Sequence, residues 1–275
     1  MFSLQRLGLG ILTVSTLGTA ISLSQPLSAT AGTLTLTDAT GVIATCEGNF
    51  SGANGQGLCT FVEDLKTVGA PYSYYRGSIR NGTFNGPGTL VYANGDRYEG
   101  PFRNGLSSGR GVFIFANNSR YEGEFRNGQF NGRGVMSYPD GSQYSGNFRN
   151  GLFEGSGSFL FANGDRYVGS LKLGQPHGKG LRTYNNGNRT YQGDFYLGQV
   201  NGQGVYTESD GYRCQGRFFN STLSGKGTCT YPRGDVYRSY TGELQNGKPE
   251  GRGTLTYANG RRFTGVFYRG EPVER

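Results

Sequence analysis

The sequence predicts an all-β protein built as a long antiparallel meander of β-hairpins. A tyrosine, replaced by cysteine at Cys214 and by phenylalanine at Phe263, returns at steps of mostly 23 residues, and each return opens the same phrase, clearest in Tyr121–Gln143. A fixed period of this length is typical of an array of small stacked repeats. Within each phrase large or glycine residues alternate with polar ones, which is strand periodicity. The opening positions are Tyr75, Tyr98, Tyr121, Tyr144, Tyr167, Tyr191, Cys214, Tyr240 and Phe263.

Residues 1–31 lie outside this pattern and have the layout of a secretory signal peptide. Arg6 is their only charge, Leu7–Ser22 is apolar and small, and Ala29-Thr30-Ala31 supplies an A-x-A cleavage site. We expect cleavage after Ala31, and a retained N-terminal anchor is the alternative. Export would place the chain in the periplasm, outside the cell or on its surface. No second apolar run of about 20 residues follows, so we expect no transmembrane span after cleavage.

Residues 32–74 are expected to form an N-terminal strand and a degenerate first repeat with a linker. Its two cysteines occupy the opening slot and the centre of the second strand, as do the other two cysteines in a later repeat. The shared slots select the disulfides Cys46–Cys59 and Cys214–Cys229. A metal site is the competing interpretation, but the pairs lie far apart in sequence and lack C-x-x-C spacing. Disulfides also suit an oxidising compartment.

Each repeat in residues 75–275 is expected to be one hairpin. In Tyr121–Gln143 two alternating stretches are separated by Asn127-Gly128, and Pro139-Asp140-Gly141 leads into the next repeat. Because side chains alternate across a strand, the rings of both strands should share one face. We expect this face to be exposed and to contact a partner or a second copy. Its candidate residues are Tyr98, Phe102, Tyr121, Phe125, Tyr138, Tyr144, Phe148, Tyr167, Tyr184, Tyr191 and Phe195.

The chain is basic, with a formal net charge of +8. Cations recur at the end of the first strand of each repeat, so they should form a ladder that is either simply solvated or attracts an anionic surface. We expect no nucleic-acid partner for an exported chain. The candidate basic ladder consists of Arg80, Arg103, Arg126, Arg149 and Lys172.

The repeated phrase Y-E-G-x-F-x-N-G-x-x-x-G-x-G-x-x-x-Y-x-x-G resembles the MORN repeat, the membrane occupation and recognition nexus motif. The resemblance covers Tyr75 to Phe267 and includes a terminal half-repeat. It implies an elongated single-layer antiparallel sheet that serves as a scaffold or as a surface contacting lipid or protein. The family's first-strand tryptophan is replaced here, by phenylalanine at Phe102, Phe125, Phe148 and Phe195.

No set of residues indicates catalysis, a metal or a cofactor. His177 is the only histidine and falls at a slot that other repeats fill with asparagine, serine or glutamate. A triad therefore lacks partners. We expect a non-enzymatic exported scaffold that contacts an unidentified protein or an envelope or lipid surface, with self-association as a further possibility. The alternative is a module that binds cell wall or carbohydrate.

Overall fold

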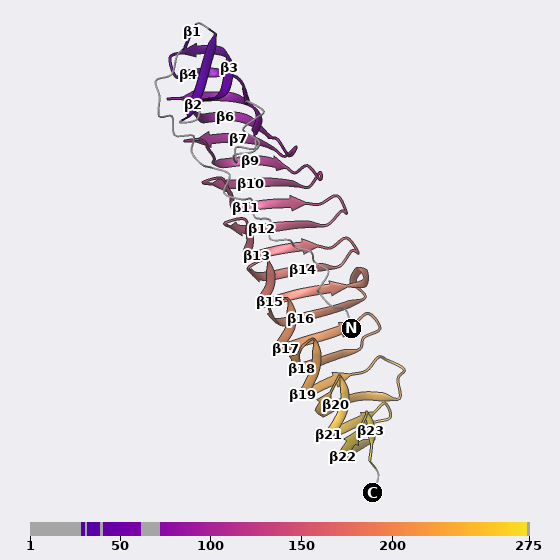
Figure 1. Ribbon diagram of the computed structural model, residues 1–275. Coiled ribbons are helices and arrows are strands. Elements are labelled where there is room, and N and C mark those ends of the chain that lie inside the picture. Colours follow the sequence, from indigo (N-terminus) through magenta and orange to yellow (C-terminus); the bar gives the residue numbers. More distant parts are fainter. Residues whose placement is uncertain (1–28, 31, 39–40, 62–71, 274–275) are drawn as a thin grey trace. The chain divides into compact units, whose positions relative to one another are not determined.

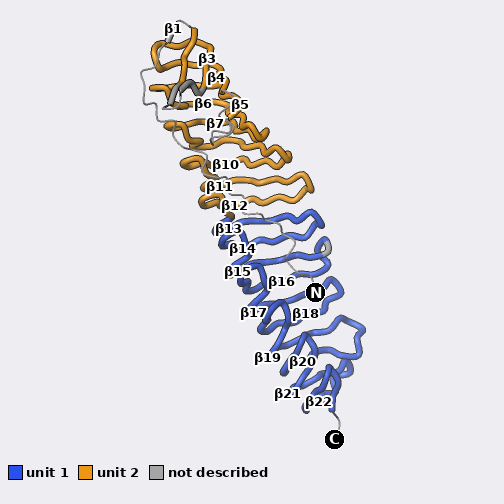
Figure 2. The backbone as a smooth tube through the Cα atoms, in the orientation of Figure 1, with its two compact units in different colours: residues 1–8, 153–275 blue, residues 9–152 orange. Residues whose placement is uncertain are grey.

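The computed structural model describes residues 29–30, 32–38, 41–61 and 72–273. The expected signal peptide therefore lies outside the described residues except for Ala29–Thr30 and so does most of the expected linker before Tyr75. The chain divides into two compact units, shown in Figure 2. The described part of the N-terminal unit lies within residues 29–152, and that of the C-terminal unit within residues 153–273.

The described part of the N-terminal unit consists of strands that pair antiparallel with their neighbours (Figure 1). The short β8 pairs with β7 only, and β9 continues along β7 and then pairs with β10. The strands are β1 (Ala29–Thr30), β2 (Thr33–Asp38), β3 (Gly41–Ser51), β4 (Asn54–Phe61), β5 (Tyr72–Arg80), β6 (Thr83–Tyr92), β7 (Arg97–Arg103), β8 (Leu106–Ser107), β9 (Gly109–Ile114), β10 (Arg120–Arg126), β11 (Gln129–Ser137) and β12 (Gln143–Arg149).

The C-terminal unit is also an antiparallel meander, in which each strand pairs with the next. Its one described helical element is a 3-10 turn, η3 (Asn185–Gly187). The strands are β13 (Leu152–Leu160), β14 (Arg166–Lys172), β15 (Gln175–Tyr184), β16 (Arg189–Tyr196), β17 (Gln199–Glu208), β18 (Arg213–Phe219), β19 (Thr222–Thr230), β20 (Tyr237–Gln245), β21 (Lys248–Tyr257), β22 (Arg262–Tyr268) and β23 (Glu271–Pro272). The prediction of an all-β antiparallel hairpin array is confirmed in each unit.

The turn dipeptides close the hairpins as the sequence predicts. Asn127 and Gly128 both have positive φ, 50° and 77°, between β10 and β11. This conformation matches the twist of a two-residue hairpin, and asparagine and glycine tolerate it best. Between repeats, the Gly141 N–H donates to the Tyr138 carbonyl at 3.0 Å and the Asp140 side chain accepts from the Ser142 N–H at 2.8 Å.

Each hairpin bends halfway along, at a register shift. Gly123 lies opposite Gly134, whereas the next pair is Glu124 with Asn131, so two residues of β11 bulge out. The same shift follows the glycine pair in other repeats, for example after Gly169 and after Gly193. A bulge bends its strand and increases the local twist. The bend turns the two halves of the hairpin toward each other on the ring side.

The core of each unit is the ring-filled inside of this bend. A Cβ atom built on Gly134 would lie 2.5 Å from the Tyr121 ring, so the ring lies directly over the glycine pair. The Phe130 ring, from beyond the bulge, stacks on Tyr121 with centroids 3.9 Å apart. Glycine is therefore required where the rings cover the backbone. The core is aromatic because rings supply most of the large side chains, each burying roughly 150–250 Å².

Candidate functional site

The expected exposed ring face is buried, so that part of the sequence prediction is wrong. The bend closes the rings of neighbouring strands over one another, which leaves little of them in contact with water. Tyr138 and Tyr184 remain half-buried. The other candidates are 5% exposed or less: Tyr98, Phe102, Tyr121, Phe125, Tyr144, Phe148, Tyr167, Tyr191 and Phe195.

Tyr121 illustrates how the opening tyrosine is held. Its hydroxyl donates to the Glu124 carbonyl at 2.8 Å, and the rings of Phe125 and Phe148 meet it edge-on at 5.2 and 4.9 Å. The same hydroxyl bond, to the carbonyl three residues on, recurs in other repeats. Burial disfavours the phenolate and raises the pKa of Tyr167 and Tyr191 to about 12. These tyrosines hold the fold together.

The cations expected to form a ladder are exposed at the end of the first strand. In the N-terminal unit this row consists of arginines only. Two other arginines, at the starts of first strands, are each paired with a glutamate two residues on: Arg97 with Glu99, and Arg120 with Glu122 at 2.7 Å. Exposed ion pairs of this kind contribute little stability. The row is Arg80, Arg103, Arg126 and Arg149, followed in the C-terminal unit by Lys172.

In the C-terminal unit the same row changes from cations to exposed rings. After Lys172 its members are Tyr196, Phe219, Gln245 and Tyr268. The three rings are 56%, 61% and 57% exposed. The sequence analysis missed them, although their slot, which arginine fills in earlier repeats, could have identified them.

Two leucines extend this apolar surface at the hairpin turns. Leu173 and Leu197 stand where other repeats have asparagine, with φ of 50° and 46°. They are 64% and 52% exposed. A branched apolar residue in the left-handed region is strained by roughly 1–2 kcal/mol, and asparagine tolerates it better. Exposed leucines at strained positions are a feature that folding alone does not favour.

The turns that carry these residues are neighbours in the C-terminal unit. The Gly198 N–H donates to the Pro176 carbonyl at 2.9 Å, and the Ser221 N–H donates to the Val200 carbonyl at 2.9 Å. Each turn is thus hydrogen-bonded to the start of the second strand of the preceding repeat. His177, on β15, adds its ring 5.2 Å from the Tyr196 ring. We call the exposed set Leu173, Tyr196, Leu197 and Phe219 the tip patch.

A buried ion pair interrupts the core of the C-terminal unit. Arg182 lies between Tyr167 and Tyr191, in a row that other repeats fill with leucine, methionine, phenylalanine, tyrosine or a disulfide-bonded cysteine. Its guanidinium is 3.6 Å from the Asp165 carboxylate, and both side chains are largely buried, at 14% and 8% exposure. It also lies over the Phe161 ring at 4.9 Å. The sequence analysis did not single out this pair.

The outer face of the C-terminal unit, opposite the rings, forms a groove of about 1480 Å³ along β14–β22. Its walls combine exposed apolar side chains with amides, hydroxyls and a few charges. Val168 and Leu181 are 50% and 39% exposed. The amide-bearing residues of the lining are Gln192, Gln203 and Gln215.

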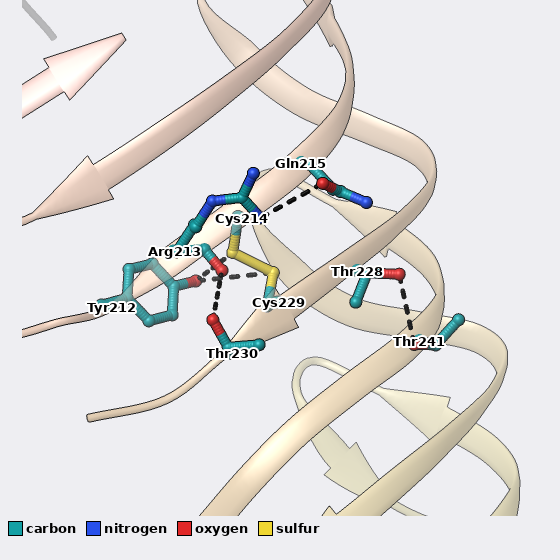
Figure 3. The surroundings of a disulfide bond; sticks show 8 residues. All are labelled: Tyr212, Arg213, Cys214, Gln215, Thr228, Cys229, Thr230 and Thr241. Atoms are coloured by element: carbon teal, nitrogen blue, oxygen red, sulfur yellow. Dashed lines mark hydrogen bonds between the residues drawn. A yellow bond between two sulfur atoms is a disulfide. The ribbon is translucent and has the colours of Figure 1, made fainter. Parts of the chain in front are cut away.

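The two expected disulfides are the ones that the structure contains. Each joins residues that face each other across a hairpin, with Cα atoms 3.8 Å apart for Cys46–Cys59 and 4.1 Å for Cys214–Cys229. Figure 3 shows the Tyr212 ring beside the second bond, its hydroxyl 2.9 Å from Cys214 Sγ. The cystine thus replaces the buried tyrosine in that repeat.

Among the described residues, no group of three or more His, Cys, Asp or Glu side chains is placed to hold a metal ion. A helix with the length and apolar character needed to cross a membrane is not found in the described part of the chain.

Comparison with known proteins identifies the repeat. The MORN repeat family matches eight consecutive segments, and no curated protein sequence matches the chain. The segments are residues 75–97, 98–120, 121–143, 144–166, 167–189, 191–211, 214–236 and 240–261.

Solved structures with distant similarity include domains of CPAP proteins. The G-box domain of the microcephaly protein CPAP is 13% identical, with 86% of this chain and 100% of that chain covered and a TM-score of 0.36. The TCP10 domain of Danio rerio CPAP, as an E1021V mutant, is 15% identical, with 88% and 100% covered and a TM-score of 0.35. The TCP domain of SAS-4 from Drosophila melanogaster is 14% identical, with 58% and 85% covered and a TM-score of 0.27.

Proposed function

The chain belongs to the MORN repeat family, and from this we propose that it is a non-enzymatic scaffold, exported to an oxidising compartment, that docks on a lipid surface through its tip patch. Two disulfides support export, since such bonds persist outside the reducing cytosol. The apolar leader with its A-x-A site supports it as well. His177 stands at a position that recurs in the other repeats, where asparagine, serine or glutamate fills it. This supports a structural role for the position and not a catalytic one.

The tip patch is the observation that carries the lipid proposal. Leucine and aromatic side chains project from adjacent turns, and Lys172 stands beside Leu173. Apolar and aromatic side chains that enter the boundary between headgroups and acyl chains, together with cations facing anionic headgroups, are the usual means of peripheral membrane binding. The strain at the two leucines favours a functional reason for keeping them apolar.

The test replaces both turn leucines by the asparagine of the sister turns, as Leu173→Asn with Leu197→Asn. Burying one leucine contributes roughly 1.5–3 kcal/mol, so the variant should bind anionic vesicles at least tenfold more weakly in a sedimentation assay. It should also be more stable than wild type, because asparagine tolerates positive φ. Loss of binding with a gain in stability cannot come from unfolding.

The matched control lowers the backbone strain of a turn in the N-terminal unit instead, through Asn127→Gly. It should leave vesicle binding unchanged. The lipid proposal is contradicted if the wild-type chain binds neither anionic nor zwitterionic vesicles, or if the double leucine variant binds as well as wild type.

A second candidate function is binding of cell-wall polymer or carbohydrate in the groove. The amides of Gln192, Gln203 and Gln215 favour it, because they offer donors and acceptors in a row to a hydroxyl-rich chain. Retention of the protein on insoluble wall polymer, weakened by Gln203→Ala and not by the leucine variant, would support this function over lipid docking.

A further inference from the structure

The N-terminal unit begins with a repeat whose second strand is β2 and in which only the two-residue β1 stands, among the described residues, in the place of a first strand. Leu34 on β2 lies opposite Cys46, as Met136 on β11 lies opposite Tyr144. The Gly48 N–H donates to the Gly32 carbonyl at 2.9 Å, so a glycine also stands in the slot of Gly134. β2 is thus half of a repeat, with its inner edge on β3.

The C-terminal unit ends, in its described part, with the opposite half. β22 is a first strand, opened by Phe263, and it pairs with β21 along its length. β23 meets it only through Phe267 with Pro272 and Tyr268 with Glu271. Within residues 72–273, no strand pairs with the outer edge of β22 from Arg262 to Gly265.

The packing around Phe263, the aromatic residue at the start of β22, is correspondingly incomplete. Tyr240, one repeat earlier, is flanked by Cys229 and Leu255 and is fully buried. Phe263 is flanked by Leu255 and, among the described strands, has no neighbour on the other side. It is only half-buried. A second strand with an apolar residue opposite Phe263 and a glycine opposite Gly265 would complete the repeat.

The backbone groups on the two free edges match. The Val273 N–H donates to the Val266 carbonyl at 2.9 Å, so Val266 faces the outer edge of β22 and, by alternation, so does Thr264. On β2 the Gly32 carbonyl faces β3, so the backbone of Thr33 faces outward. A register with Gly265 opposite Gly32 would place Thr264 opposite Thr33, where the two residues could exchange backbone hydrogen bonds.

We propose that β22 of one copy pairs antiparallel with β2 of a second copy, which completes a MORN repeat across the two chains. The register places Phe263 opposite Leu34 and Thr264 opposite Thr33. The two contacting edges are different, so the contact is head-to-tail and a dimer still offers one free edge of each kind. Assembly therefore continues beyond two copies unless a ring closes.

The outer edge of β2 is free only when β1 is absent. β1 pairs with the outer edge of β2 through Thr30 with Thr33 and Ala29 with Leu34. Removal of residues 1–31 takes β1 away, so this inference rests on the export part of the proposed function. The uncleaved chain has a covered edge, as strands that must not associate prematurely usually do.

The experiment compares the full-length chain with the chain beginning at Gly32 by sedimentation velocity over a wide concentration range. The shorter chain retains every strand from β2 to β23. It should form species larger than a dimer as concentration rises, whereas the full-length chain should remain a monomer. A strictly monomeric shorter chain overturns the proposal, and so does equal assembly by both.

Two proline variants identify the edges. Thr33→Pro and Thr264→Pro each remove an outward backbone N–H, a position at which an edge strand accepts proline. Each variant alone should be monomeric. An equimolar mixture should give dimers and nothing larger, because one variant keeps β22 and the other keeps β2. Larger species from either single variant, or a monomeric mixture, contradict head-to-tail pairing.

The matched controls are Thr33→Val and Thr264→Val. Thr264→Val loses the 3.0 Å hydroxyl contact with Thr254 but keeps the backbone donor, so it should assemble as the unsubstituted chain does. Circular dichroism of all variants verifies that they fold. Two further measurements are made separately from assembly. Mass spectrometry of the exported protein identifies its N-terminus, and sedimentation with vesicles measures lipid binding. An assembling Gly32 chain with no processing in cells contradicts export while leaving the strand pairing intact.

Discussion

The glycine pair under each tyrosine gives the sharpest test of the core. In Gly134→Ala the new Cβ would lie 2.5 Å from Tyr121 Cε2 and 2.6 Å from its hydroxyl. That ring cannot move aside easily, because Phe130 stacks on it at 3.9 Å and its hydroxyl is bonded to the Glu124 carbonyl. Overpacking of this kind costs about 1–3 kcal/mol.

A double-mutant cycle isolates the ring as the cause. Tyr121→Ala alone should cost about 3–5 kcal/mol, because it empties a fully buried aromatic site. With the ring gone, the three atoms nearest to the Cβ of Gly134→Ala are removed, since all three belong to Tyr121. The double variant should therefore lose about 2 kcal/mol less than the sum of the single variants.

Native-state hydrogen exchange on peptides from β10 and β11 is the suitable assay, because a repeat array can open locally. Gly141→Ala is the control: no heavy atom lies within 4 Å of its Cβ, and its φ of +84° supplies a backbone cost unrelated to the ring. Its cost should add to that of Tyr121→Ala. If Gly134→Ala is also additive within about 0.5 kcal/mol, the ring does not explain the glycine.

Three further predictions concern the C-terminal unit. Replacing Cys214 and Cys229 by serine should cost about 3 kcal/mol in urea unfolding, as expected for a cross-link that closes a loop with a sequence separation of 15. Tyr167 and Tyr191 have pKa values of about 12 in the folded chain against 10.0 without burial, so their contribution should be complete below pH 10 and lost as pH rises through 12, seen as a falling urea midpoint. Arg182→Met should cost about 3–5 kcal/mol in the same urea unfolding, because it removes the cation that faces the largely buried Asp165 carboxylate, and replacing that carboxylate by asparagine as well should recover most of the loss.

The sequence by itself determined the repeat, its register and the disulfide pairing. These features follow from local rules. Asn127-Gly128 closes a hairpin through its own backbone preferences, and side chains alternate across a strand whatever surrounds them. Cys214 and Cys229 occupy slots that face each other in every hairpin, so the period alone places them together.

Only the tertiary structure decided which of these positions meet water. Alternation says that Tyr121 and Phe130 share a face, but not that the bulge after Gly123 bends the hairpin until their rings stack. The expected contact face became the core for this reason. Periodicity marks the slots of the tip patch as departures from the repeat, but it does not show that these side chains are exposed, and it does not reveal the Arg182 ion pair. Exposure and charge pairing depend on side chains contributed by neighbouring hairpins, and no rule confined to one repeat contains them.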